Sequence, residues 1–110
     1  MSESVTCVIY CVRHPITKEV KYVGQTYQLK VRLNAYMAEV TGGVTRPIIC
    51  WIRELMAQGL KPEFAILDSD IYWEDSLIAE SVWINYFMAK GVKLLNKEAK
   101  HIERRFTLVA

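Results

Sequence analysis

The chain has few of the residues from which disulfide scaffolds and zinc sites are built. Its 110 residues include three cysteines and two histidines. The cysteines are odd in number and lack C-x-x-C spacing, and neither histidine stands at a zinc-like interval from one of them. Because both kinds of site require such spacings, the pattern predicts buried free thiols, a reducing compartment and no structural zinc.

Segments for targeting, membrane spanning or repetition are also missing. Glu3 precedes the first short apolar run and Arg13 follows it, which matches neither a secretory signal nor a membrane span. No internal repeat, low-complexity tract or linker is visible. The net charge of +2 permits a nucleic-acid partner without indicating one. We therefore expect one cytoplasmic domain over residues 1–110 that binds no membrane.

What the chain does contain is typical of an ordered globular protein, with 52% hydrophobic and 24% charged residues. Residues 5–12 are apolar on both alternating faces, which predicts a central strand covered on two sides. Residues 13–19 include Pro15 and fit a hairpin loop, so residues 20–23 should return as an antiparallel partner that ends at Gly24.

Three helices and a third strand should complete the chain. Thr26 is the expected N-cap of a helix through about Val40, and a second helix should run from Pro47 to Gly59. Residues 63–68 fit a strand and residues 73–90 a last helix. The predicted fold is α+β, a small three-stranded antiparallel sheet flanked by helices.

The last helix contains an unexpected acid. At 100° per residue its apolar stripe consists of Trp73, Leu77, Ile84 and Phe87, and Glu80 falls in the middle. Burying an unpaired charge costs several kcal/mol, so the carboxyl must be paired, protonated, bound to a metal or placed at a cleft. A salt bridge to a basic residue is the purely structural alternative.

Five marks along the chain appear together in a known order. They are V-I-Y at residues 8–10, Y-V-G-Q-T at residues 22–26, Arg32, Glu80 and Asn96. This succession resembles the GIY-YIG nuclease superfamily and covers residues 8–96, with a basic tail at residues 97–110. The resemblance implies a metal-dependent endonuclease that hydrolyses nucleic-acid phosphodiester bonds, with DNA as the expected substrate.

The resemblance implies a role for each of four catalytic residues. Tyr10 would orient or deprotonate the attacking water, and Tyr22 would hydrogen-bond that water or the scissile phosphate. Arg32 would hold the phosphate, and Glu80 would bind a single Mg²⁺ or Mn²⁺ that keeps most of its waters. Without the resemblance, strand aromatics, a solvated arginine and a salt-bridged acid would explain the same residues. A free tyrosine is a poor base at neutral pH, so the base role requires a lowered pKa.

Three further positions would support this site. Gly24 would let the backbone turn beside it, and Asn96 would supply an outer hydrogen bond. Two departures from the family pattern stand out: Val8 replaces a glycine, and Tyr36 stands where many relatives carry histidine. Tyr36 would either donate a hydrogen bond in place of that histidine or simply pack.

Contacts to nucleic acid outside the site would come from basic residues near the carboxyl end, unless these form only a solvated helical face. The candidates are Lys93, Lys97, Lys100, Arg104 and Arg105. Trp51 and Trp73 are expected to pack in the core rather than to stack on bases. So small a domain predicts low intrinsic specificity, or specificity supplied by a homodimer or a recruiting protein partner. The alternative function is an inactive module on the same fold that binds nucleic acid or protein.

Overall fold

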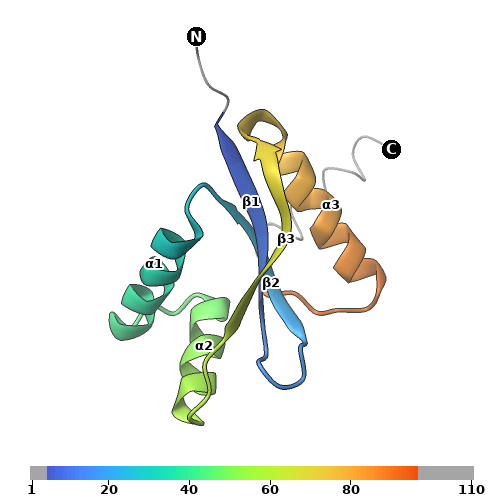
Figure 1. The fold of residues 1–110 in the computed structure, drawn as a ribbon. Coiled ribbons are helices and arrows are strands. Elements are labelled where there is room, and N and C mark those ends of the chain that lie inside the picture. Colours follow the sequence, from blue (N-terminus) through green and yellow to red (C-terminus); the bar gives the residue numbers. More distant parts are fainter. Residues whose placement is uncertain (1–4, 97–110) are drawn as a thin grey trace.

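A computed structural model of the chain describes residues 5–96 and confirms the predicted α+β fold. The strands form one antiparallel sheet in the order β2-β1-β3, with α1 and α2 against one face and α3 against the other (Figure 1). The elements are β1 (Thr6–Arg13), β2 (Val20–Thr26), α1 (Leu29–Thr41), α2 (Pro47–Ala57), β3 (Glu63–Tyr72), the 3-10 turn η1 (Trp73–Asp75) and α3 (Ser76–Ala89).

Strand β1 is the central strand, as its two apolar faces predict. Ile9 and Cys11 point into a core shared with Ile84 of α3. Tyr10 and Val12 point the other way, into a core formed with α1 and α2. Burial on both faces explains why the strand is a nearly continuous apolar run.

The free thiols are confirmed at all three positions. Cys7 and Cys11 are buried, and Cys50 is half-buried. Within residues 5–96, every helix is too short or too polar to cross a bilayer.

Strand β2 is longer than predicted, and the expected break at Gly24 is wrong. The strand continues to Thr26 and pairs with β1 throughout, with Gly24 directly opposite Tyr10. A Cβ atom at position 24 would lie 2.6 Å from the Tyr10 hydroxyl oxygen. Glycine is therefore needed here for the space that the tyrosine fills, and it does not interrupt the strand.

The start of α1 also differs from the prediction. Gln28, and not Thr26, is the N-cap residue, and its side chain makes no capping hydrogen bond. The Thr26 hydroxyl instead accepts a hydrogen bond from the Gln28 backbone N–H at 3.3 Å and contacts the Gln28 carbonyl at 3.4 Å. These contacts hold the turn between β2 and α1.

Strand β3 extends four residues beyond the predicted end at Asp68, to Tyr72. Its second half contains the polar run Asp68–Asp70, with Asp70 at a positive φ of 57°, and the pairing with β1 is irregular there. Pairing resumes between Ile71 and Cys7 and ends between Tyr72 and Thr6. The polar run hides this strand from a hydropathy pattern, because backbone pairing with β1 and not apolar alternation maintains it.

Candidate active site

Three tyrosines from three elements meet on the sheet face that α1 covers. Tyr22 of β2 lies opposite Val12, two residues along from Tyr10 on β1, so both side chains leave the same face. The Tyr10 and Tyr36 hydroxyl oxygens are 2.9 Å apart and hydrogen-bonded. The Tyr36 ring meets the Tyr10 ring at 6.4 Å and the Tyr22 ring at 6.2 Å, edge to face in both cases. We call these residues the tyrosine cluster.

Burial controls the ionisation of this cluster. Tyr10 and Tyr36 are 2% and 1% exposed, whereas Tyr22 is half-buried. Burial raises the pKa of Tyr10 to about 12, even though the hydrogen bond with Tyr36 and the charge of Arg32 both lower it. Burial also raises the pKa of Tyr36 far above its ordinary value. The lowering of the Tyr10 pKa by Arg32 is thus present but is outweighed by desolvation.

Arg32 and Glu80 belong to the two helical layers that flank the sheet, Arg32 to the layer that covers the tyrosine cluster and Glu80 to the layer on the opposite face. Arg32 is an exposed residue of α1, and Glu80 is a half-buried residue of α3. Both charges act on the Tyr10 hydroxyl, since Arg32 lowers the Tyr10 pKa and Glu80 raises it. Two layers of the fold therefore place opposite charges within electrostatic reach of one phenol.

The apolar stripe predicted for the last helix is wrong at its first half. Trp73 lies in η1, before α3 begins, and is 49% exposed, and Leu77 is 64% exposed. The buried residues of α3 are Ser76 and Ile84, one turn before and one turn after Glu80. Glu80 is half-buried between these two residues, so it does lie on the inner face. The first half of the stripe fails because Trp73 precedes the regular helix and Leu77, in its first turn, is not covered.

Asn96 acts on the site through the backbone of β2. Its buried side-chain amide accepts a hydrogen bond from the Val23 N–H at 3.0 Å and donates one to the Val23 carbonyl at 2.6 Å. The Leu95 N–H also donates to the Lys21 carbonyl at 2.7 Å. Since Val23 lies between Tyr22 and Gly24, this pairing closes the outer edge of β2 where the strand carries the site.

The sequence pattern gave no sign of Arg46, which joins the cluster from the start of α2. Its Nε and Nη2 atoms donate to the two carboxylate oxygens of Glu39 at 3.0 and 2.9 Å. The guanidinium carbon lies 5.9 Å from the centre of the Tyr36 ring. The Glu39 hydrogen bond is the main reason that the pKa of Arg46 is raised, and the Tyr22 side chain is a further hydrogen-bond partner. No local spacing marks this contact, because it depends on how α1 and α2 pack.

Glu80 is the carboxylate in this site that could hold a divalent ion. Over residues 5–96, histidine, cysteine, aspartate and glutamate side chains do not gather in groups of three or more. Mg²⁺ is usually held by one or two carboxylates together with waters and substrate phosphates. The donor set at Glu80 fits that mode and does not fit a closed all-protein cage.

The expected contacts to nucleic acid are divided between described and undescribed residues. Lys93 is exposed. Lys97, Lys100, Arg104 and Arg105 lie outside the described range. Trp51 is half-buried against the core of α1 and α2, in line with the expected packing, whereas the exposure of Trp73 contradicts it.

Comparisons with protein-family models, with curated proteins and with solved structures return no match. A functional assignment therefore has to come from the motif residues and from the geometry around them.

Proposed function

We propose that this chain is a metal-dependent endonuclease of the GIY-YIG type that hydrolyses phosphodiester bonds in DNA. The observation that carries the proposal is the meeting of Tyr10, Tyr22 and Tyr36 at a point on which Arg32 and Glu80 act with opposite charge. Strand pairing alone would explain two neighbouring tyrosines, but it would not explain a cation and an acid from opposite layers that both act on the pKa of one of them.

Arg32 would bind the scissile phosphate. Its side chain belongs to an exposed position on α1, where a polymer can reach it. A guanidinium offers a planar fork that matches two phosphate oxygens and keeps its charge at any working pH. The same cation offsets the negative charge that builds on the phosphorus oxygens during attack.

Tyr10 serves to orient the attacking water. With a pKa of about 12 it is a neutral phenol at pH 7, so it is a poor acceptor for a whole proton. Its hydroxyl is fixed by the hydrogen bond to Tyr36, which is itself buried. Tyr22 is more accessible and stands beside Arg46, and it supplies the hydrogen bond to the water or to the phosphate.

Glu80 would hold a Mg²⁺ or Mn²⁺ ion. When bound, such an ion polarises a nonbridging oxygen and steadies the departing 3′ oxygen. Glu80 is half-buried on α3, one turn from each of the buried residues Ser76 and Ile84. The free thiols and the small size of the domain further support a cytoplasmic enzyme of low intrinsic specificity, with a dimer or a protein partner to direct it.

The test is metal-dependent nicking of supercoiled plasmid, with single-stranded, branched and RNA substrates in parallel. We expect the wild type to cut with Mg²⁺ or Mn²⁺ and to be silent with chelator. Glu80→Gln should lower the rate at least about 100-fold, because the carboxylate charge is lost at constant shape. Glu54→Gln, an exposed glutamate of α2, is the matched control and should keep full activity.

Cooperative thermal melting of both variants shows that the fold is intact. If wild type and Glu80→Gln behave alike on every substrate, the nuclease proposal fails and the binding module replaces it.

A further inference from the structure

Two large aromatic side chains that the proposed chemistry does not use lie together at the surface. Tyr27, in the connection from β2 to α1, is 52% exposed, and Trp73, at the start of η1, is 49% exposed. Their ring centroids are 5.5 Å apart and their planes are inclined by 32°. The rings come from segments 46 positions apart in the chain (73 − 27), so tertiary structure and not local sequence brings them together.

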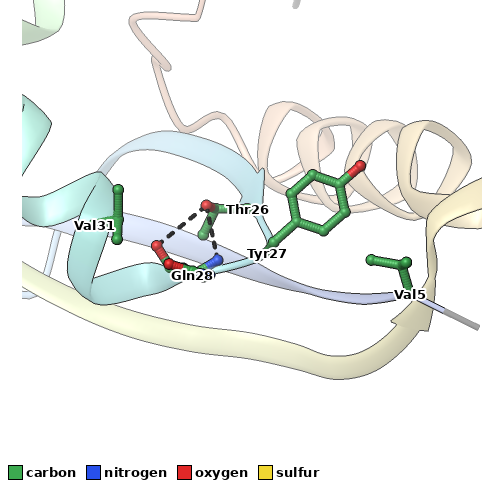
Figure 2. A pocket seen from close by; sticks show the side chains of 5 residues that line it. All are labelled: Val5, Thr26, Tyr27, Gln28 and Val31. Carbon is green, nitrogen blue, oxygen red and sulfur yellow. Dashed lines mark hydrogen bonds between the residues drawn. The ribbon is translucent and has the colours of Figure 1, made fainter. Parts of the chain in front are cut away.

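An open pocket adjoins this pair. It has a volume of about 390 Å³ and is lined by Val5, Thr26, Tyr27, Gln28 and Val31 (Figure 2). Two hydrogen bonds hold the chain segments that line the pocket. The Gln28 N–H donates to the Thr26 hydroxyl oxygen, and the Trp73 N–H donates to the Val5 carbonyl at 2.9 Å. The second contact fixes the wall of the pocket to the residue that carries the indole.

We call Val5, Tyr27, Val31 and Trp73 the aromatic patch. All four side chains are about half exposed or more, which is unusual for residues of this size and polarity gathered at one place.

The aromatic patch begins where the proposed phosphate site ends. Tyr27 follows Gly24, the residue opposite Tyr10, by three positions, a distance of about 10 Å at the rise of an extended chain. Val31 lies directly before Arg32 on α1. Because Val31 lines the pocket and adjoins Arg32 in the chain, a nucleotide next to a phosphate held by Arg32 would be within reach of the patch.

The charges around the patch favour a base over a phosphate. Lys30 and Arg32 are exposed on the α1 side, and the exposed Glu74 and Asp75 directly follow Trp73. The acidic side repels a polyanionic backbone, and the basic side attracts it. A flat, uncharged ligand fits the surface between the basic and the acidic side. Such a ligand binds best when it is aromatic, because it can then stack on the exposed rings.

Resting on the proposed nuclease function, we infer that the aromatic patch stacks an unpaired base next to the scissile phosphate. The preferred substrate is then a single strand or a locally opened duplex. In an intact duplex each base is already covered on both faces, so it must be unstacked before it can reach the patch. Stacking on aromatic side chains tolerates any base, which agrees with a domain that has little room for sequence readout.

The experiment measures binding apart from cleavage. Full-length Glu80→Gln protein is titrated into labelled 12-nucleotide single strands and the matching duplex in Ca²⁺ buffer, and fluorescence anisotropy is followed. We expect tighter binding of the single strand, and about 10-fold weaker binding when Tyr27→Ala or Trp73→Ala is added. Tyr27→Phe should keep the affinity, since it keeps the ring. Tyr86→Ala is the matched control, because Tyr86 is 47% exposed on α3 outside the patch.

Each outcome decides one point. Unchanged single-strand affinity in Tyr27→Ala and Trp73→Ala would overturn the inference and leave the nuclease proposal standing. A changed oligomeric state in light scattering, with unchanged affinity for DNA, would overturn it in favour of a protein interface. If the wild type binds single strands through the patch but never cuts, the stacking site is supported and the nuclease proposal fails.

Discussion

Replacing Gly24 with alanine tests how closely the strand backbone and Tyr10 are fitted. The added Cβ atom would lie 2.6 Å from the Tyr10 hydroxyl oxygen, 2.7 Å from Cζ and 2.9 Å from Cε1. All three separations are shorter than carbon contacts allow. Tyr10 has little room to move aside, because it is 2% exposed and its ring packs against Tyr36 and Phe64.

The cost follows from these contacts. Overpacking of a buried site costs about 1–3 kcal/mol, and loss of the hydrogen bond between Tyr10 and Tyr36 costs about 1 kcal/mol more. We expect Gly24→Ala to lower the free energy of unfolding by about 2–4 kcal/mol. At about 4–8 °C per kcal/mol for a domain of this size, the melting midpoint should fall by at least about 8 °C. This is opposite to the small gain that alanine gives where glycine is replaceable.

Urea denaturation followed by far-UV circular dichroism measures the change. Gly42→Ala is the control, because Gly42 has an ordinary φ of −78° and its nearest Cβ contact, at 3.1 Å, is a single carbonyl oxygen. In a Tyr10→Leu background, Gly24→Ala should cost much less than it does in the wild type, since the ring is gone. Tyr10→Phe should not, because Cζ and Cε1 remain. A Gly24→Ala protein as stable as the wild type would refute the packing argument.

Three further predictions concern the surroundings of the site. Asn96→Ala removes both hydrogen bonds to Val23 and should lower the free energy of unfolding by about 2 kcal/mol, measured by calorimetry. Arg46→Lys loses the two-pronged contact to Glu39 and should slow nicking about 10-fold with an unchanged fold, so equal rates would exclude Arg46 from the site. Burial raises the pKa of Tyr10 to about 12, so the folded state disfavours the phenolate, and the free energy of unfolding should fall by roughly 3 kcal/mol as pH rises from 10 through about 12. Alkaline unfolding should show that loss in the wild type and less of it in Tyr10→Phe.

The strands and helices that obey a local rule were predictable. The two-sided apolar run of β1 requires a covered strand, and Pro47 marks the start of α2. The predictions fail where a contact with a residue far away in the sequence outweighs the local conformational preference. Gly24 is a glycine because of Tyr10 and not because a strand ends there. The second half of β3 is a strand although it is polar, because β1 supplies its partners.

The candidate site divides in the same way. The order of the motif residues singled out Tyr10, Tyr22, Arg32 and Glu80, and the structure brings the two tyrosines to one sheet face with both charges in electrostatic reach of Tyr10. The hydrogen bond between Tyr10 and Tyr36 joins residues 26 positions apart, and no periodicity encodes it.

The sequence by itself determined the element types and the central strand, and its resemblance to a nuclease family named the residues that we propose for phosphodiester chemistry. It could fix the elements because alternation and helical period are properties of neighbouring positions. Only the tertiary structure decided that Tyr10 is desolvated, that Arg46 joins the cluster and that Tyr27 and Trp73 share one exposed surface. Burial and contact depend on which elements pack together, and that is a property of the whole chain.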